Sequence, residues 1–348
     1  MIIFDGIIEK LQQSGGVSVY FQELTKRIGN RNSNSNSKVS YLNYSGGTSL
    51  IVPSEFNVIN NNSRFLERYR DVDLSGIALG DRTLFHSSYY RLPKFCDSKP
   101  KIVTTVHDFT YEKYISGSRL MMHKWQKYRA IKSSDIVICV SENTANDLLE
   151  YCPIDQDNIR VVYNGVSDDY FQTPESNVIN VIVFVGSRAK YKNFDLAVLA
   201  VSLTDDFELQ IVGGGALTQL EIATLDKYLP NRYRWLGYLG NNELNSLFNS
   251  AHCLLYPSSY EGFGIPILEA MRAGCPVITS NRSSIPEVAG NAGILIDSFN
   301  PHDYKDAILN LNNTSERSSY VTKGLEQAEK FSWDKCFSQT LSIYNELI

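Results

Sequence analysis

The sequence predicts an α/β protein built from two open domains, each a parallel sheet with helices on both faces. Three observations lead to this fold class. The chain has 348 residues, which is more than one ordinary hydrophobic core accommodates. Short β-branched runs alternate with helical stretches, the order expected of βαβ units. The β-branched runs are also nearly all apolar, as in strands that are buried on both faces of a sheet.

The second half of the chain carries the clearer pattern. Apolar positions such as Leu244, Leu247 and Phe248 keep helical spacing between two of the apolar runs. We expect strands at 181–186, 208–215, 233–237, 253–258, 276–280 and 293–297, and helices at 195–202, 216–229, 242–251 and 266–274.

The first half repeats this alternation with more interruptions. A polar, low-complexity stretch at 29–38 is expected to be a mobile loop. We expect strands at 1–5, 38–42, 83–87, 101–107, 135–140 and 158–164, and helices near 17–28, 118–133 and 142–151.

A linker is predicted at 172–177, which lacks apolar residues and contains Pro174. It would separate a Rossmann-like domain at 1–172 from a second one at 173–331. The amphipathic stretch at 332–348 is expected to form a helix that packs back on the first domain. Because open α/β sheets bind ligands at the carboxyl ends of their strands, we expect the two domains to face each other across a ligand-binding cleft.

The composition excludes several classes of protein. A hydrophobic content of 43% with 20% charged residues is typical of a folded globular chain, and a net charge of −5 argues against nucleic-acid binding. The stretch 1–10 has no basic lead or cleavage site, so we expect a first strand and not a signal peptide. The longest apolar run, 178–185, is too short to span a bilayer. A cytoplasmic protein is therefore expected.

The cysteines support the same compartment. They are scattered without a CxxC pair, and several lie inside apolar runs. We expect six reduced thiols, at Cys96, Cys139, Cys152, Cys253, Cys275 and Cys336.

The loop after the predicted strand at 181–186 carries three cations. Arg188, Lys190 and Lys192 precede a helix, whose unpaired N–H groups also attract anions. This combination favours a phosphate site, although a solvated lysine-rich loop has the same composition. The glycines at 213–215 lack the third glycine of a dinucleotide fingerprint. They would allow close approach to a ligand or simply form a tight turn.

The stretch YEGFGIPILEAMRAGCPVITS at 260–280 places two carboxylates on different elements. Glu261 lies in a glycine-containing loop, and a proline suits the first turn of the helix that follows. The glycines let main-chain amides point at a ligand, and the helix start adds a partial positive charge. Glu269 lies about one turn into that helix and faces the same opening. The two carboxylates are therefore expected to bracket a phosphate and not to share a proton.

The first half offers candidates at the ends of its strands. Gly15 and Gly16 lie between a strand and a helix and would allow close approach of an anion. His107 and Asp108 end the strand at 101–107, where a structural histidine and a functional one are equally compatible with the pattern.

An aromatic element follows the strand at 83–87. It could contact a sugar or form a surface aromatic patch, and its candidate residues are His86, Tyr89, Tyr90 and Arg91. The pair Asp71 and Asp73 has the form of a divalent-metal site, but no strong strand precedes it, and we interpret it as a surface loop.

The stretch EGFGIPILEAMRAGCPVITSNRSSIPEVAGNAGILID resembles the donor-binding half of the retaining glycosyltransferases of family 4, whose fold is the two-domain GT-B type. The resemblance extends through FVGSRAKYKNF, QIVGGG, RWLGYLGNNELNSLF, TVHDF, IVICVSENTANDLL, RVVYNGV and AEKFSWDKC. It covers most of the chain and weakens between about 29 and 80.

This resemblance implies a role for each matching residue. Glu269 would bind the ribose hydroxyls of a nucleotide-diphosphate sugar, and Glu261 would face the reacting sugar. Arg188 and Lys192 would neutralise the leaving diphosphate, with His107 over the donor sugar. Arginine usually follows the strand-ending glycine directly, whereas Ser187 stands there in this chain. The remaining donor-binding residues would be Gly15, Gly16, Gly213, Tyr238, Phe263, Gly264 and Ile265, and the acceptor-binding ones His86, Tyr89, Tyr90, Arg91 and Asp108.

The implied activity is retaining transfer of a sugar without a metal or another cofactor. The opening stretch 4–24 resembles the branch that builds O-antigen and related bacterial surface polysaccharides. That resemblance favours a mannose or deoxymannose donor carried on GDP, with UDP or dTDP possible, and a glycan or lipid-linked oligosaccharide acceptor. The alternatives are an epimerase or phosphorylase on the same fold and a non-catalytic nucleotide-sugar-binding subunit of a polysaccharide assembly complex.

A lipid-linked acceptor would bring the enzyme to the inner face of the cytoplasmic membrane. The stretch 118–135 interleaves basic and apolar side chains and suits a membrane-surface helix. A solvated helix with one buried apolar stripe fits the same pattern. The residues in question are Arg119, Leu120, Met121, Met122, Lys124, Trp125, Lys127, Arg129, Ile131 and Lys132.

Overall fold

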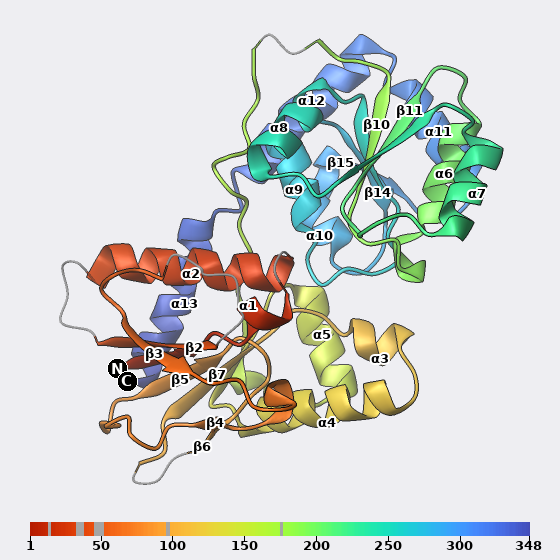
Figure 1. Ribbon diagram of the computed structural model, residues 1–348. Coiled ribbons are helices and arrows are strands. Elements are labelled where there is room, and N and C mark those ends of the chain that lie inside the picture. The colour runs from red at the N-terminus through yellow and green to blue at the C-terminus, as the bar shows by residue number, and fades with distance from the viewer. Residues whose placement is uncertain (13–14, 33–37, 45–51, 95–97, 175–176) are drawn as a thin grey trace. The chain divides into compact units, whose positions relative to one another are not determined.

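The computed structural model describes residues 1–12, 15–32, 38–44, 52–94, 98–174 and 177–348 (Figure 1). The chain divides into two compact units, Met1–Asn164 with Trp333–Ile348, and Gly165–Ser332. Cys96 and residues 33–37 of the predicted mobile loop lie outside the described residues, as do residues 175–176 of the predicted linker. The other five cysteines are buried free thiols.

The division between the units falls at Asn164/Gly165, before the predicted linker at 172–177. The reason is that the segment after Gly165 is bound to the second unit. Its backbone amides at Phe171 and Thr173 donate to the side chains of Asn245 and Asn249, at 3.0 and 2.6 Å. Low hydrophobicity in this segment therefore marks a strap on the surface of one unit and not a free linker.

The first unit is built around a parallel seven-stranded sheet of order β3-β2-β1-β5-β7-β8-β9. Sequence reasoning did not find β3, which is rich in asparagine and largely exposed, or the small β4–β6 pair. The strands are β1 (Ile2–Asp5), β2 (Val39–Tyr44), β3 (Asn57–Asn61), β4 (Val72–Asp73), β5 (Leu84–Ser87), β6 (Pro93–Lys94), β7 (Lys101–Val106), β8 (Ile136–Cys139) and β9 (Ile159–Val161).

Helices cover this sheet, and the C-terminal helix α13 (Trp333–Leu347) belongs to the same unit, where it packs against α2. The contact is fixed by a buried hydrogen bond from the Tyr344 hydroxyl to the ring of His86 on β5, at 2.5 Å. The other helices are α1 (Ile8–Leu11), α2 (Gly16–Asn32), α3 (Thr110–Tyr114), α4 (Ser118–Ser133) and α5 (Glu142–Tyr151), with short 3₁₀ turns η1 (Glu67–Tyr69) and η2 (Gln156–Asn158).

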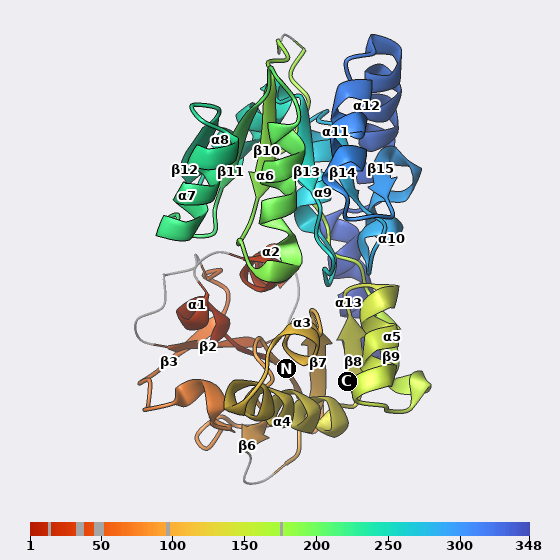
Figure 2. The same cartoon turned by 90° about the vertical axis from the view of Figure 1, so that its right-hand side faces the viewer.

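The second unit is a parallel six-stranded sheet of order β12-β11-β10-β13-β14-β15 (Figure 2). The chain builds outward from β10 to β12 and then returns to place β13 on the other side of β10. The strands are β10 (Val181–Val185), β11 (Glu208–Val212), β12 (Tyr233–Gly237), β13 (Cys253–Tyr256), β14 (Val277–Ser280) and β15 (Gly293–Ile296).

Helices lie on both faces of this second sheet, as its near-continuous apolar strands predict (Figure 1). The helices are α6 (Phe194–Ser202), α7 (Gln219–Tyr228), α8 (Asn241–Ser250), α9 (Ile265–Arg272), α10 (Ile285–Ala289), α11 (Pro301–Asn310) and α12 (Thr314–Ala328), with 3₁₀ turns η3 (Lys190–Lys192) and η4 (Gly290–Ala292).

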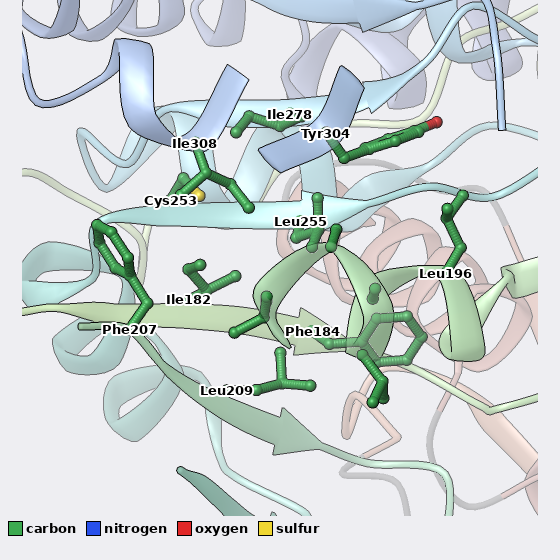
Figure 3. Packing of buried hydrophobic residues seen from close by; sticks show 14 of the residues in the cluster. Ile182, Phe184, Leu196, Phe207, Leu209, Cys253, Leu255, Ile278, Tyr304 and Ile308 are labelled. Atoms are coloured by element: carbon green, nitrogen blue, oxygen red, sulfur yellow. The ribbon is translucent and has the colours of Figure 1, made fainter. Parts of the chain in front are cut away.

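A buried apolar cluster joins one face of this sheet to helices α6, α7 and α11 (Figure 3). Ile182 and Phe184 of β10 and Leu255 of β13 contribute side chains that are at most 1% exposed. Burial of apolar area on this scale dominates the stability of such a layer. The core holds β10 and β13 rigidly side by side, which fixes the positions of the loops that leave their carboxyl ends.

Candidate functional site

The second sheet has a topological switch point between β10 and β13. These neighbours pair through Ile182↔Cys253 and Val183↔Leu254, yet the chain leaves them toward opposite edges of the sheet. In open α/β sheets ligands bind at the carboxyl ends of the strands that flank such a point. The loops 186–193 and 257–264 leave these two ends and contain the residues that the sequence analysis selected.

The loop after β13 turns directly into helix α9. Gly264 has φ +101, a conformation that side chains disfavour, and a Cβ there would lie 3.2 Å from Cδ1 of Ile267. Pro266 occupies the first turn of the helix, where its missing N–H costs nothing. The predicted loop and helix are confirmed. The ring of Phe263 packs edge-on against Phe331 at 5.8 Å, so the ring belongs to the core of the unit.

Two serines from the neighbouring loop hold this turn in place. The amide of Glu261 donates to Oγ of Ser283 at 2.8 Å. The hydroxyl of Ser284 donates to the carbonyls of Glu261 and Phe263 at 2.9 and 3.1 Å. The main chain that presents Glu261 is therefore bonded on both sides.

The loops after β10 and β13 are also bonded to each other. Asn193, which has φ +52, donates from Nδ2 to the carbonyl of Pro257 at 2.8 Å and to Oγ of Ser259 at 3.2 Å. The amide of Ser259 donates to the carbonyl of Tyr191 at 2.7 Å. These bonds make the two loops one rigid body at the switch point.

Lys192 and Glu261 form an ion pair across the switch point. Nζ of Lys192 lies 2.5 Å from Oε1 of Glu261, and each side chain is 11% exposed. Nζ also donates to the hydroxyl of Tyr256, which is 3.1 Å away. The pair lies at the carboxyl ends of β10 and β13, the place where open α/β sheets bind ligands. The sequence predicted both residues, but not that they contact each other.

Arg188 does not take the role that the sequence predicted. Its guanidinium donates to the carbonyls of residues 213–216 at 2.8–3.2 Å and to Oε1 of Glu221 at 2.8 Å. Gly214 has φ +71 and a Cβ there would lie 2.7 Å from the backbone carbonyl oxygen of Gly186, so glycine is needed there. Because the guanidinium is used by the glycine turn, Arg188 has a structural role, and of the predicted cation pair Lys192 faces the site.

The glycine turn at 213–215 is bonded to the end of β12, whereas the loop after β12 carries an exposed tyrosine. The amide of Gly213 donates to the carbonyl of Gly237 at 2.7 Å, which ties the turn to the end of β12 and leaves that amide unavailable. Tyr238, one residue farther, is 72% exposed. Its exposed ring is compatible with the predicted donor-binding role of Tyr238.

Glu269 lies on α9 and is partly buried. Burial raises the pKa of the Glu269 carboxyl to about 7, and a hydrogen bond from Tyr170 opposes this rise. Tyr170 is 1% exposed and also donates to Oδ1 of Asn241 on α8 at 3.3 Å. The prediction that Glu261 and Glu269 do not form a proton-sharing dyad fits these environments, because Glu261 pairs with a lysine and Glu269 with a tyrosine.

In the first unit, His107 keeps one unused polar atom. Its Nε2 is buried and has no hydrogen-bond partner among the described residues, while the ring packs edge-on against Tyr20 at 5.2 Å. Burial lowers the pKa of His107 to about 4, so the imidazole is neutral at pH 7. Its neighbour Asp108 accepts from the amide of Thr110 at 2.9 Å, which is a local turn contact.

Gly15 and Gly16 lie at the start of α2, as expected. A Cβ at Gly15 would come within 2.3 Å of the end of the Gln12 side chain, which is flexible and can shift. This contact therefore does not by itself require glycine.

The predicted acceptor role of His86 and Arg91 is wrong. His86 is fully buried, and its two ring nitrogens contact the hydroxyls of Tyr344 and Thr105 at 2.5 and 2.9 Å. Arg91 is 1% exposed and pairs with Asp5 at 3.0 Å and Glu67 at 2.6 Å. Both side chains are fully used inside the unit because their strand ends are covered by other elements.

Tyr89 and Tyr90 differ from these two in being half-buried. Tyr89 hydrogen-bonds Arg68 and lies 3.4 Å from Nδ1 of His123, and Tyr90 packs edge-on against the same histidine at 5.7 Å. They form part of an aromatic cluster with one accessible side. The alternative interpretation, an aromatic patch, describes their surroundings better than a sugar-binding site does.

Asp71 and Asp73 are not buried, as the surface interpretation predicts, but Asp73 belongs to strand β4 and not to a loop. Asp71 pairs with Arg129, and Asp73 accepts from the amide of Ser75 at 2.9 Å. Among the residues that the structure describes, no group of three or more His, Cys, Asp and Glu side chains could hold a metal ion. No helix in the same ranges is long and apolar enough to cross a membrane.

Comparison with known proteins gives two consecutive family matches. Residues 50–170 match the family described as Glycosyltransferase Family 4, and residues 168–327 match Glycosyl transferases group 1. An O-antigen chain mannosyltransferase B of Escherichia coli is 30% identical over 294 residues, which cover 76% of this chain and 74% of that protein. The chain belongs to the glycosyltransferases of family 4.

Solved structures show that the glycosyltransferase has the predicted GT-B fold. WaaG, a glycosyltransferase involved in lipopolysaccharide biosynthesis, superposes with a TM-score of 0.77 at 17% identity and covers 99% of both chains. HepE of Anabaena, solved in complex with UDP-glucose, gives 0.78 at 14% identity with the same coverage. At these identities the likeness establishes the fold alone, with its two Rossmann-like units.

Several residues of the glycosyltransferase site escaped sequence reasoning. Asn193, Ser259, Ser283 and Ser284 bond the loops to one another, and Tyr256 contacts the ion pair. A usable signal existed for the serines, because Ser283 and Ser284 follow the end of β14 and so lie at the same edge of the sheet as Glu261.

If Glu269 binds the ribose of a sugar nucleotide, as the resemblance implies, its raised pKa predicts an affinity that depends on pH. Ribose hydroxyls donate to an ionised carboxylate, and a protonated Glu269 loses one acceptor position. Ionised Glu269 accumulates as the pH rises through 7, so affinity should be lost as the pH falls, by about tenfold between pH 8 and pH 6.

Isothermal titration with an intact sugar nucleotide measures this dependence, because its diphosphate diester does not titrate in that range. E269Q is the control, and its affinity should be lower and independent of pH. A flat profile for the unsubstituted protein, or an equal slope in E269Q, would contradict the assignment.

Proposed function

We propose that this glycosyltransferase transfers a mannose- or deoxymannose-type sugar from a nucleotide-diphosphate sugar, with retention of configuration and without a metal. A GDP-sugar is the favoured donor, with UDP- and dTDP-sugars as alternatives. The acceptor is a glycan or lipid-linked oligosaccharide that becomes a surface polysaccharide. The observation that carries this proposal is the Lys192–Glu261 ion pair at the switch point of the second sheet.

The ion pair supplies charge where the reaction needs it. Breaking the bond between C1 of the sugar and the diphosphate oxygen develops negative charge on the leaving group and positive charge on the sugar. The Lys192 ammonium stabilises the first and the Glu261 carboxylate the second. Both groups are fixed by loops that are bonded to each other, so little reorganisation accompanies the reaction.

Retention follows from attack on the same face of the sugar. The acceptor oxygen forms its bond to C1 on the side that the diphosphate leaves, and the acceptor proton passes to the departing phosphate oxygen. Glu261 then acts as an electrostatic and positioning residue and not as a nucleophile. Its pairing with Lys192 supports this role, because a carboxylate that is bound to an ammonium is a weaker nucleophile.

Nucleotide recognition is assigned to α9 and its surroundings. Glu269 would bind the ribose hydroxyls, the main-chain amides at Phe263, Gly264 and Ile265 would hold the diphosphate at the helix start, and Tyr238 would stack on the base. In the first unit, Nε2 of His107, which has no hydrogen-bond partner among the described residues, would contact a sugar.

The names of related proteins support the substrate class. The Escherichia coli relative is a mannosyltransferase that acts on O-antigen chains, and HepE was solved with UDP-glucose. These names favour a hexose donor on a nucleoside diphosphate and a polysaccharide acceptor.

A donor panel tests the proposal. GDP-, UDP- and dTDP-sugars are incubated with the purified protein, with and without lipid-linked or synthetic glycan acceptors, and nucleotide release is followed with and without EDTA. Acceptor-dependent release that is unaffected by EDTA, with retained configuration in the product by NMR, is expected. Turnover of donor without acceptor would favour the epimerase, dependence on inorganic phosphate the phosphorylase, and binding without release the non-catalytic subunit.

We further propose that α4 associates with the inner face of the cytoplasmic membrane. Met121, Met122 and Trp125 are 73%, 46% and 54% exposed, next to the exposed Arg119 and Lys124. Large exposed apolar side chains beside basic ones suit an anionic bilayer surface. The opposite face of the helix is core, since the predicted membrane residues Lys127 and Ile131 are buried.

Co-sedimentation with anionic phosphatidylglycerol vesicles tests this assignment. The variant R119E/K124E/W125S should lose at least about tenfold in vesicle affinity, because two attractive charges and one inserted ring are removed. K227E/K323E changes two exposed lysines of the second unit by the same charge and should bind as the unsubstituted protein does. Equal binding by both variants would refute the role of α4.

A further inference from the structure

We propose that Tyr256 is a positioning residue that holds Lys192 and Glu261 in their reactive arrangement. This inference rests on the proposed function of the ion pair. It assigns a role to the Tyr256 hydroxyl, which core packing does not require. Tyr256 is the last residue of β13, so it lies directly at the switch point.

The Tyr256 hydroxyl is bonded to both members of the pair. It accepts from Nζ of Lys192 at 3.1 Å and hydrogen-bonds the Glu261 carboxylate, which in turn lies 2.5 Å from the same Nζ. The ammonium also lies 5.1 Å from the centre of the Tyr256 ring. The three groups close a triangle in which each constrains the other two.

The tyrosine itself is held firmly. Its side chain is 3% exposed, and its carbonyl accepts from Oγ1 of Thr279 on β14 at 2.6 Å. Because both the ring and the backbone are fixed by the core, the hydroxyl is a stationary reference point for two longer, more flexible side chains. A stationary hydroxyl restricts the side-chain conformations of Lys192 and Glu261 before a donor binds. Less conformational entropy is then lost on binding.

The hydroxyl stays protonated under all working conditions. Burial, together with the negative charge of Glu261, holds the pKa of Tyr256 well above its usual range. The group therefore donates to the carboxylate and accepts from the ammonium at the same time. When a donor diphosphate attracts the ammonium, the O–H still orients Glu261 toward the sugar.

Another tyrosine of the same unit provides the contrast. Tyr304 on α11 is fully buried, and its hydroxyl has no hydrogen-bond partner among the described residues (Figure 3). Both rings fill core volume that phenylalanine would fill equally well. Of these two hydroxyls, that of Tyr256 contacts charged groups of the site, so the comparison isolates the contribution of positioning.

The first test compares Y256F with Y304F in acceptor-dependent nucleotide release. Loss of a hydrogen bond to charged groups should lower kcat of Y256F by about 10- to 100-fold, with a change of less than about threefold in the donor KM. Y304F should keep the kcat of the unsubstituted protein. A kcat for Y256F within about twofold of the unsubstituted protein would overturn the inference, since a purely structural tyrosine changes stability and not the rate constant.

A second test does not depend on activity. Thermal unfolding is compared for Y256F in the unsubstituted protein and in the K192M/E261M background, which lacks both hydrogen-bonding partners of the hydroxyl. Y256F should shift the Tm in the first and leave it nearly unchanged in the second, because its partners are absent. Equal shifts in both backgrounds would overturn the inference. Coupling in a protein that releases no nucleotide with any donor would refute the proposed function and leave the contact itself established.

Discussion

Replacing Lys192 with methionine is expected to lower kcat by about 10²- to 10³-fold, the range found when one preorganised partner of a developing charge is removed. Methionine keeps most of the apolar stem, so the change removes the ammonium and little packing. Charge on the leaving diphosphate would then lack its nearest cation, and Glu261 would lose its partner at 2.5 Å.

Steady-state nucleotide release with a saturating acceptor measures the effect. K190M is the matched control, because Lys190 belongs to the same 3₁₀ turn but is exposed. It should keep kcat within about twofold. If K192M behaves like K190M, the ammonium plays no part in the reaction.

The second large effect is expected for Glu261→Gln, which should lower kcat by about 10²-fold or more. Glutamine keeps the size and the hydrogen-bonding geometry but removes the negative charge that faces the developing positive charge of the sugar. Binding of the free nucleoside diphosphate should change little, since its ribose and base contact other residues in the proposed site.

The double variant K192M/E261Q discriminates a coupled pair from two independent groups. Because each single change leaves the other charge without a partner, the combined loss should be smaller than the product of the two single losses. Losses that multiply would mean that the two groups act separately, and the ion pair would then be a feature of the resting protein alone.

Much of the fold could be predicted from the sequence because buried strands form apolar runs that are recognisable in the sequence. The six strands of the second sheet are short apolar runs separated by helical periodicity, and each predicted run contains the observed strand. In the first unit β3 was missed because asparagine-rich residues 57–61 carry no hydrophobic pattern. That edge strand exists because its backbone pairs with β2, and backbone pairing is not visible in side-chain composition.

Candidate residues could be predicted where a charged side chain directly follows a recognisable strand. Glu261, Glu269 and Lys192 lie in loops that directly follow strands, and parallel strands deliver all such loops to one edge. The same rule also selected His86 and Arg91, which turned out to be core residues. Being next to a strand end does not reveal whether a helix or loop covers that end, as Tyr344 covers His86.

The sequence by itself determined the α/β class, the glycine turns and the helix start that presents Glu261, because these depend on periodicity and on backbone conformation within a few residues. Only the tertiary structure decided the use of each charge. In the structure Arg188 hydrogen-bonds the carbonyls of a neighbouring turn, and Lys192 pairs with Glu261. The Tyr256 hydroxyl contacts both Lys192 and Glu261. These choices follow from distances between segments that lie tens of residues apart, and a charged side chain binds whichever partner the fold brings nearest.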